Sequence, residues 1–325
     1  MEMRWLGRTG VQVSQLCYGT MSFGGDADEA EAGRMYAACR EAGINFFDCA
    51  DTYSGGAAEE ILGRLIAPER DDIVLTSKVA MPVGKDADIN ARGLNRRHIA
   101  RGVEASLKRL GTDRLDLLFL HRWDANTPLE ESLRALEQLV RDGKVLYLGV
   151  SNYAAWQISK ALGIQDRHGW ARFDVIQPMY NLVKRQAEVE ILPLAQAEGL
   201  GVISYGPNGG GLLTGKYRRE TKPDGTRLVT NQEYAKRYDE HWYYETAEAF
   251  TALADKVGLH PVSLAVAWAG FHPGITCPIV GARSVEQLRP SLESVSVTMD
   301  QALWDEIASL SRTPAPATDR LEEQR

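Results

Sequence analysis

The sequence predicts a (β/α)₈ barrel, a TIM barrel, that is preceded by a short β-hairpin and carries extra C-terminal helices. Eight short apolar segments recur along the 325 residues, and most of them are separated by one segment of helical periodicity. Such alternation implies parallel strands joined by right-handed crossovers, and eight units in a chain of this length favour a closed barrel. A doubly wound open sheet is the alternative. It is disfavoured because residues 17–25, CYGTMSFGG, follow the first strand in place of Gly-x-Gly-x-x-Gly.

The elements are expected in the following order. A hairpin is expected at residues 6–13, because Gly7-Arg8-Thr9-Gly10 has the composition of a turn. Strands are expected at 15–19, 44–48, 73–78, 115–121, 145–151, 174–177, 201–205 and 275–280. Helices are expected at 28–42, 57–65, 96–110, 128–141, 154–162, 187–197, 242–257, 261–270, 285–292 and 300–310. We expect residues 1–312 to form one domain and residues 313–325 to form a flexible tail.

The helix expected at 128–141 shows the pattern clearly. Its apolar residues recur at three- and four-residue intervals from Leu129 onward, which gives the helix one apolar face. Thr127 is expected to cap the first turn with its hydroxyl, and Gly143 is expected to end the helix.

The composition excludes several classes of function. The net charge of −7 gives no basic field that would attract nucleic acid or an anionic membrane. No apolar run approaches membrane-spanning length, and the N-terminus lacks the apolar core of a secretory signal. The cysteines have no metal-binding spacing, so we expect no metal site and a cytoplasmic protein with reduced thiols; they are Cys17, Cys39, Cys49 and Cys277.

Polar residues at the ends of three successive strands suggest acid-base chemistry. Asp48, Lys78 and His121 end these strands, and Tyr53 follows five residues after Asp48. In a barrel of this kind the active site lies at the carboxyl ends of the strands. A buried Lys78 needs a counter-charge, which Asp48 can supply, and a nearby ammonium is expected to lower the pKa of the Tyr53 phenol from about 10. Tyr53 would then donate a proton, while His121 would orient the same substrate oxygen.

Structural roles are the simpler interpretation of each of these residues taken alone, since structural ion pairs are common. The four together favour protonation of a carbonyl oxygen. A barrel glycosidase is excluded because it needs two carboxylates at opposing strand ends, where this chain has His121 and Ser204-Tyr205. Metal-dependent hydrolysis is excluded because His121 has no ligand partners at a recognisable spacing.

Several blocks of the sequence resemble those of the aldo-keto reductase superfamily, and they occur in the family's order between about residues 4 and 310. The blocks are FDCADTY (47–53), TSK (76–78), LHR (120–122), GKV (143–145) with LGVSN (148–152), QPMYNL (177–182) and GGLLTGKY (210–217). The last two look closest to the bacterial and channel-β-subunit-like branches.

The resemblance implies an NADP(H)-dependent enzyme that reduces aldehydes or ketones to alcohols. It implies that Asp48, Tyr53, Lys78 and His121 form the catalytic tetrad, with Tyr53 as the general acid. We expect Phe23, Tyr53, His121 and Trp123 to line the substrate pocket, since large apolar walls are typical of small-molecule sites. Trp123 stands where the family often has proline, and packing within its loop is the alternative role for it. The alternative is an NADP(H)-binding regulatory subunit that resembles the channel-associated β-subunits and has weak reductase activity.

The same resemblance implies a set of cofactor-binding residues. Ser151, Asn152 and Gln177 would hold the nicotinamide carboxamide, and Tyr205 would stack on the ring. The loop at 207–216 would cover the pyrophosphate, and the segment at 281–287 would clamp the adenosine 2′-phosphate. The full set is Gly19, Thr20, Met21, Asp48, Ser151, Asn152, Gln177, Tyr205, Gly206, Pro207, Leu212, Gly215, Lys216, Arg227, Gly281, Arg283, Ser284 and Gln287.

Overall fold

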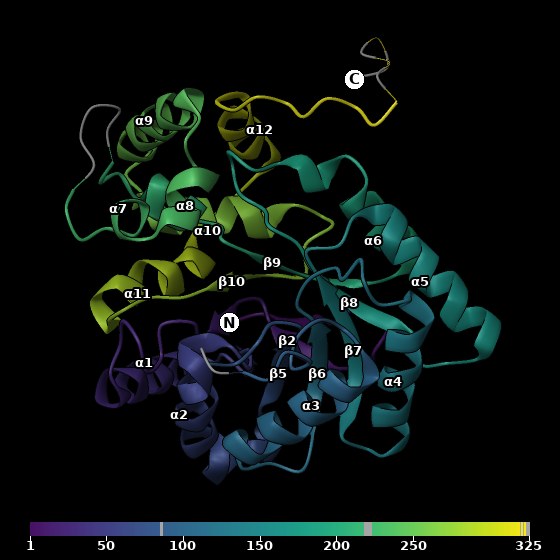
Figure 1. Cartoon of the computed structure of the whole chain (residues 1–325). Coiled ribbons are helices and arrows are strands. Elements are labelled where there is room, and N and C mark those ends of the chain that lie inside the picture. The colour runs from purple at the N-terminus through teal and green to yellow at the C-terminus, as the bar shows by residue number, and fades with distance from the viewer. Residues whose placement is uncertain (85–86, 218–222, 319, 321, 323–325) are drawn as a thin grey trace.

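Eight parallel strands close into a barrel in the computed structural model, which describes all residues except 85–86, 218–222, 319, 321 and 323–325. The order around the barrel is β10-β3-β4-β5-β6-β7-β8-β9, so every strand pairs with its neighbour in the chain and β10 closes onto β3. Figure 1 shows the strands with the helices around them. The strands are β3 Cys17–Gly19, β4 Phe46–Asp48, β5 Val74–Val79, β6 Leu115–Leu120, β7 Val145–Ser151, β8 Phe173–Gln177, β9 Gly201–Tyr205 and β10 Cys277–Val280. The predicted (β/α)₈ barrel is confirmed.

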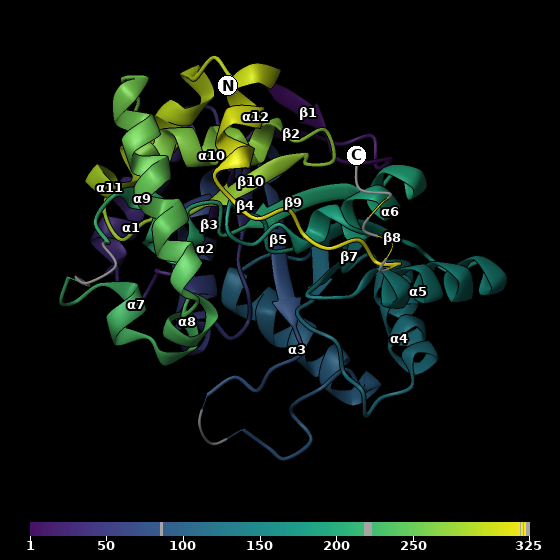
Figure 2. The same cartoon turned by 90° about the horizontal axis from the view of Figure 1, so that it is seen from above.

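Helices surround the strands on the outside (Figure 2). Most of them match a predicted segment: α1 Glu29–Glu41, α2 Ala57–Ile66, α3 Arg96–Leu110, α4 Leu129–Arg141, α5 Ala155–His168, α6 Ile191–Glu198, α9 His241–Lys256, α10 Pro261–Phe271, α11 Val285–Glu293 and α12 Gln301–Ser309. Two short helices, α7 Arg227–Thr230 and α8 Gln232–Arg237, were not predicted. They belong to the long connection between β9 and β10, and they lie between α9 and α11 in Figure 1.

Five 3₁₀ segments complete the described secondary structure: η1 Tyr53–Gly56, η2 Ala67–Asp72, η3 Gln186–Glu188, η4 Gly209–Thr214 and η5 Ser294–Ser296. Residues 313–318, at the start of the predicted tail, contain no helix or strand, and much of the remainder of that tail lies outside the described residues. Within the part of the chain that is described, no helix is both long and apolar enough to cross a membrane.

The N-terminal hairpin closes the amino-terminal end of the barrel. Its strands are β1 Met3–Trp5 and β2 Gln12–Ser14, which pair antiparallel on either side of the predicted turn. Leu6 and Val13 are fully buried and pack with the side chains inside the barrel. Gly7, at φ +56°, approaches the first residue of β9 so closely that a Cβ would lie 2.4 Å from the Gly201 amide nitrogen. The opposite end of the barrel, where the strands end, is therefore the end left for a site.

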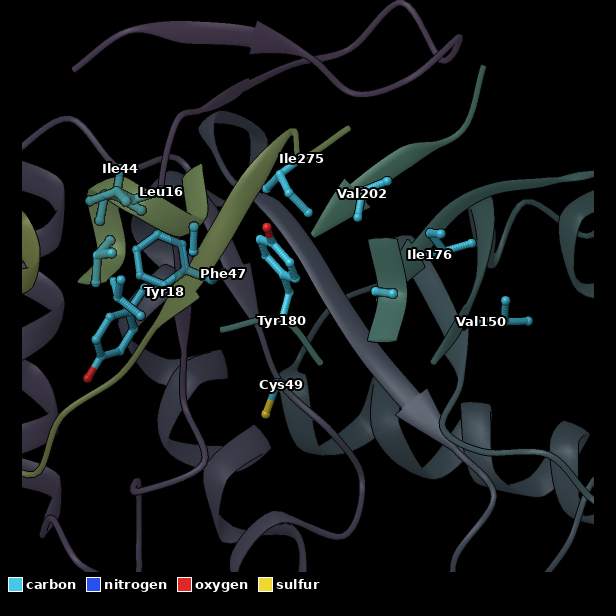
Figure 3. Packing of buried hydrophobic residues seen from close by; sticks show 14 of the residues in the cluster. Leu16, Tyr18, Ile44, Phe47, Cys49, Val150, Ile176, Tyr180, Val202 and Ile275 are labelled. Carbon is cyan, nitrogen blue, oxygen red and sulfur yellow. The ribbon is translucent and has the colours of Figure 1, made fainter. Parts of the chain in front are cut away.

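A continuous apolar layer between the strands and the helices forms the larger part of the core. Figure 3 shows part of it, in which Tyr18 and Phe47 pack edge to face with ring centroids 6.1 Å apart. A second, smaller cluster fills the barrel interior and includes Phe46 and Phe119. All the cysteines are buried and unpaired, so they act as small apolar side chains.

The starts of α3 and α4 differ in how they are capped. The Asn95 side chain accepts from the His98 amide and caps α3. Thr127, the predicted cap of α4, lies one residue too early, and Pro128 occupies the cap position without a side-chain bond. The Thr127 hydroxyl instead donates to Asp124 Oδ2 at 2.7 Å, because the loop before α4 folds around that carboxylate. The prediction for Thr127 was therefore wrong.

Candidate active site

Lys78 lies at the centre of a buried cluster at the carboxyl ends of β4 and β5. Its side chain is fully buried, and its Nζ donates to Asp48 Oδ2 at 2.6 Å, to the Cys49 carbonyl at 2.8 Å and to Tyr53 Oη at 3.2 Å. Asp48 ends β4, and Tyr53 opens η1 in the loop that follows it. The structure thus brings the lysine, the carboxylate and the phenol into direct contact.

Asp48 is held from both sides of the barrel. Its Oδ1 accepts from Thr76 Oγ1 at 2.7 Å and from Gln177 Nε2 at 2.9 Å, while Oδ2 accepts from Lys78. Thr76 belongs to β5 and Gln177 to β8, so the carboxylate connects strands that are not neighbours. Both carboxylate oxygens of Asp48 therefore have partners, which fix the position of the side chain at the mouth of the barrel.

Lys78 remains a cation despite complete burial. Burial alone lowers the pKa of its ammonium, but Asp48 and Tyr53 raise the pKa by more, so the net pKa lies above the ordinary value. The site therefore contains a permanent ion pair, to which the Tyr53 oxygen is the third partner.

The phenol of Tyr53 is less acidic than we expected from the sequence. Burial raises the pKa of Tyr53 to about 12, and Lys78 opposes that rise without overcoming it. The predicted lowering by the ammonium is present, but desolvation of the phenolate is larger because the oxygen has little access to water. Tyr53 consequently holds its proton firmly in the protein without substrate.

His121 completes the group from the next strand. It follows directly after β6, which ends at Leu120, and its ring meets the Tyr53 ring edge to face with centroids 6.0 Å apart. Burial, and then the charges of Lys78 and Arg122, lower the pKa of His121 to about 3. The imidazole is therefore neutral at physiological pH. Its Nδ1 has no partner among the described residues.

The residues expected to hold a nicotinamide form one connected network. Tyr205 Oη donates to Asn152 Oδ1 at 2.7 Å, and Asn152 Nδ2 donates to the His121 carbonyl at 3.0 Å and to Ser151 Oγ at 3.0 Å. Ser151 Oγ in turn donates to the Gln177 carbonyl at 2.9 Å. Asn152 has a φ of +59°, a left-handed conformation that residues other than glycine rarely adopt.

The glycine-rich loop after β9 uses backbone conformations that favour glycine. Gly210 and Gly211, within η4, have φ values of +66° and +101°. Gly210 is also tightly covered, because a Cβ there would lie 2.8 Å from the Tyr234 ring of α8. Of the predicted residues here, Pro207 and Leu212 are buried, whereas Gly206 and Gly215 are partly exposed.

Three predicted cations gather beside this loop. Desolvation, and then the charges of Arg283 and Arg227, lower the pKa of Lys216. Arg283 bridges two loops, since its Nε lies 3.0 Å from Asp26 Oδ2 and its Nη1 donates to the Gly225 carbonyl at 3.4 Å. Neither Lys216 nor Arg227 forms an ion pair with any residue that the structure describes.

The start of α11 contains the residues expected to bind the 2′-phosphate, and the Val285 amide there donates to Glu31 Oε1 at 2.8 Å. Ser284 is its N-cap and accepts from the Gln287 amide at 3.4 Å, and the Arg283 amide donates to Gln287 Oε1 at 3.4 Å. Gly281, between β10 and α11, is exposed. A hydroxyl, a guanidinium and a helix N-terminus at one place are well suited to a phosphate.

The residues after β3 divide between the site and the core. Gly19 ends β3, and Thr20 donates from both its amide and its hydroxyl to the Asp48 carbonyl, at 2.9 and 3.1 Å. Met21 is exposed. Phe23, expected in the substrate pocket, is fully buried and packs against Tyr18 with ring centroids 5.8 Å apart. Phe23 is therefore a core residue in this structure.

Trp123 belongs to an aromatic cluster that the sequence did not predict. It meets Tyr153 at 5.3 Å and Trp156 at 5.7 Å, both edge to face, and the Trp156 side chain is 60% exposed. Tyr153 directly follows Asn152, just after the end of β7. This position after a strand end could have identified Tyr153 as a residue near the mouth of the barrel.

The polar groups at and beside the glycine-rich loop fit a dinucleotide cofactor. Lys216 and Arg227 lack ion-pair partners within the described chain, and the buried Ser204 Oγ and Asn208 Oδ1 have no hydrogen-bond partner there. The described residues contain no group of three or more His, Cys, Asp or Glu side chains that could hold a metal ion. The two cations and the Ser204 hydroxyl can bind phosphate oxygens, whereas Asn208 Oδ1 can only accept a hydrogen bond.

A barrel with these groups at its mouth corresponds to a known family. The sequence model described as "Aldo/keto reductase family" matches residues 15–312, nearly the whole chain. The chain belongs to the aldo/keto reductase family, whose members are oxidoreductases that generally use NAD(P)H and act on small carbonyl compounds.

Relatives with several different names share this fold over most of their length. The uncharacterized oxidoreductase YrpG of Bacillus subtilis (strain 168) is 38% identical over 312 residues, which cover 93% of this chain and 94% of YrpG. A probable voltage-gated potassium channel subunit beta of Arabidopsis thaliana is 36% identical, with 91% and 92% covered. Norsolorinic acid reductase A of Aspergillus parasiticus is 33% identical, with 90% and 76% covered.

Proposed function

We propose that this protein reduces aldehydes or ketones to alcohols with NADPH, and that Tyr53 is the general acid. The observation that carries the proposal is the position of Lys78 Nζ, 2.6 Å from Asp48 Oδ2 and 3.2 Å from Tyr53 Oη. This contact couples a permanent cation to a phenol at the open end of the barrel. Oxidoreductases among the relatives support the same class of reaction.

The contact also sets the direction of the phenol proton. Lys78 Nζ donates to the Tyr53 oxygen, so the hydrogen of Tyr53 is free to point to a substrate oxygen. When bound, the reduced nicotinamide supplies a hydride to the carbonyl carbon. As negative charge develops on the carbonyl oxygen, Tyr53 transfers its proton, and the adjacent ammonium stabilises the phenolate that remains.

His121 orients the substrate in this proposal. A neutral imidazole donates one ring N–H, and the low pKa of His121 keeps it in that form across the physiological range. A hydrogen bond from His121 and another from Tyr53 to one carbonyl oxygen would polarise it before proton transfer.

The cofactor would be held along the mouth of the barrel. Ser151, Asn152 and Gln177 would bind the carboxamide, and the Tyr205 ring would stack on the nicotinamide. The remaining phosphate contacts would come from Lys216, Arg227, Arg283, Ser284 and the backbone of η4. Because Arg283 and Ser284 suit a 2′-phosphate, we propose a preference for NADPH over NADH.

The Tyr53→Phe variant tests the proposal with NADPH and para-nitrobenzaldehyde. We expect kcat to fall by roughly a hundredfold or more, because general acid catalysis contributes at least that factor. NADPH affinity, followed by quenching of tryptophan fluorescence, should change less than twofold. The matched control is Tyr147→Phe, which removes a hydroxyl bonded to the Thr9 carbonyl at the other end of the barrel. A near-normal rate for Tyr53→Phe would refute its role as acid.

A regulatory nucleotide-binding subunit is the second candidate, because one relative at 36% identity is named a probable potassium channel subunit beta. Such a protein would bind NADPH and turn over slowly. Continuous NADPH oxidation by the wild-type protein with an activated aldehyde, at rates typical of an enzyme, would favour the reductase.

A further inference from the structure

Tyr53 is followed by a backbone turn that residues other than glycine rarely adopt. Ser54, Gly55 and Gly56 have φ values of +49°, +66° and +102°, so three consecutive residues lie in the left-handed region. Glycine enters this region freely, but a residue with a Cβ, such as Ser54, is strained there. Strained backbone persists only where the surrounding structure fixes it. The left-handed turn, residues 54–56, must therefore be held by its neighbours.

The Arg109 side chain covers the end of the left-handed turn. Gly56 is buried, and a Cβ on it would lie 2.9 Å from Arg109 Cδ and 3.1 Å from Arg109 Nε. Arg109 belongs to α3, and α3 lies close to α2, since a Cβ at Gly63 of α2 would be only 2.4 Å from the Leu110 carbonyl oxygen. The turn and the arginine thus fit against each other with no room for a larger residue at position 56.

A buried carboxylate fixes Arg109 in this position. Arg109 Nε and Nη2 both lie 2.7 Å from Glu59 Oε2, and Nη2 also donates to Ser106 Oγ at 3.4 Å. The Glu59 side chain is fully buried, whereas the Arg109 side chain is 18% exposed. Because a carboxylate buried in this way needs a charged partner, Glu59 keeps the guanidinium in place over the turn.

The same carboxylate contacts the strand that carries Lys78. Glu59 Oε1 accepts from Ser77 Oγ at 2.5 Å, and Ser77 directly precedes Lys78 on β5. Two routes therefore connect β5 to the left-handed turn. One is the direct contact of 3.2 Å between Lys78 Nζ and Tyr53 Oη. The other runs behind the site, through Glu59 and Arg109 to the end of the turn.

We propose that Arg109 is a positioning residue for the general acid, because it holds the left-handed turn so that the Tyr53 phenol stays beside Lys78. The proposal rests on the reductase function above and adds the part of the molecule that fixes the acid. Proton transfer requires the phenol to lie within hydrogen-bond reach of the substrate oxygen. A displacement of about 1 Å is therefore expected to lower the rate of reduction and to leave cofactor binding unchanged.

The Arg109→Gln variant tests the proposal through the difference between kcat and KM. We expect kcat with NADPH and para-nitrobenzaldehyde to fall about tenfold or more, while KM for NADPH changes less than about twofold. The matched control is Arg40→Gln, which breaks an ion pair of the same kind between α1 and η2, with Arg40 Nη2 2.7 Å from Glu69 Oε2. A normal kcat for Arg109→Gln, or an equal loss in the control, would overturn the proposal.

Two further variants separate the position of the side chain from the stability of the protein. Arg109→Lys keeps the charge opposite Glu59 and the apolar stem over Gly56, so its kcat should stay within about threefold of the wild-type value. If Arg109→Gln does not fold, the double variant Glu59→Gln/Arg109→Gln replaces it, because that variant leaves no buried charge unpaired. The same loss of kcat is expected, and a wild-type kcat for the double variant would refute the role of Arg109.

Hydrogen exchange tests the positioning without any turnover. The Gly55 amide donates to the Thr52 carbonyl at 3.1 Å, a bond that local opening of the turn would break. Mass spectrometry of a peptide that covers residues 50–58 should show exchange about tenfold faster or more in Arg109→Gln, and no change in Arg40→Gln.

The exchange measurement also separates this inference from the reductase proposal. If the wild-type protein does not oxidise NADPH with an activated aldehyde, the reductase function fails, and exchange alone decides whether Arg109 holds the left-handed turn. Faster exchange confined to the turn would support that role. Unchanged exchange in Arg109→Gln, or an equal increase across the whole chain, would overturn it.

Discussion

At the scale of single residues, burial and nearby charges together set the pKa of each ionisable group at the mouth of the barrel. Lys78 stays charged because Asp48 and Tyr53 raise its pKa by more than burial lowers it. Tyr53 stays neutral because burial raises its pKa by more than Lys78 lowers it. His121 stays neutral because burial and the Lys78 charge both lower its pKa. The outcome depends on whether the nearby charges outweigh the desolvation of the charged form of the group. A neutral acid beside a fixed cation is the state required for proton donation.

Asp51 is a buried carboxyl group that has no ion-pair contact among the described residues. It is fully buried, and neither of its oxygens accepts a hydrogen bond from a described side chain. Burial, and then the Glu59 charge, raise its pKa from 3.8 to about 7, against opposing contributions from Arg109 and Lys78. The folded protein thus binds this proton more tightly than the unfolded chain does.

This difference predicts a pH dependence of stability. Below pH 4 Asp51 is protonated in both states, and above pH 4 only the unfolded chain loses the proton until about pH 7. The free energy of unfolding should therefore fall by at most ~4 kcal/mol as the pH rises across that window, and it should then level off. Asp51→Asn should remove this contribution and be the more stable protein at pH 8. Urea unfolding at pH 5 and pH 8 measures it, and equal pH slopes for the two proteins would contradict the assignment.

At the scale of elements, the hairpin is fixed to the barrel by one close backbone contact. Gly7→Ala would place a Cβ 2.4 Å from the Gly201 nitrogen, which is backbone and cannot move aside as a side chain could. Gly10→Ala is the matched control, since Gly10 has a φ of +75° in the same turn but nothing within 4 Å of its added Cβ. We expect ~1–2 kcal/mol of destabilisation for Gly10→Ala, and clearly more for Gly7→Ala, in urea unfolding. Equal losses would show that the close approach does not matter.

The elements also show which parts of the structure a sequence can predict. Apolar strands and helices that end at glycine are local sequence patterns. The barrel and the positions of Asp48 and Lys78 near strand ends could therefore be predicted from them. α7 and α8 have only 4 and 6 residues, too short for a periodic pattern, and α7 depends on contact with η4. Phe23 looked like a pocket residue from its place after β3, but its burial against Tyr18 is a tertiary property. The net pKa of Tyr53 likewise depends on burial by distant segments.

At the scale of the whole molecule, the mouth joins segments from both ends of the chain. Arg283, near the C-terminus, pairs with Asp26 near the N-terminus and with Gly225 in the long β9–β10 connection. A ligand that binds Arg283 would therefore bind a residue that already connects the loop at Asp26, the β9–β10 connection at Gly225 and the segment before α11. Binding to the folded state alone stabilises the whole protein, by about 2.7 kcal/mol at a hundredfold excess over Kd.

The role proposed for Arg283 predicts which cofactor gives the larger stabilisation. We expect NADPH to raise the midpoint of thermal unfolding more than NADH at equal concentration, and Arg283→Ala to remove most of that difference by weakening NADPH tenfold or more. Asp26→Asn breaks the same ion pair but keeps the guanidinium, so it should bind NADPH at least as tightly as the wild-type protein. If Asp26→Asn and Arg283→Ala weakened NADPH equally, the loss would come from the broken loop contact, and Arg283 would not bind the 2′-phosphate.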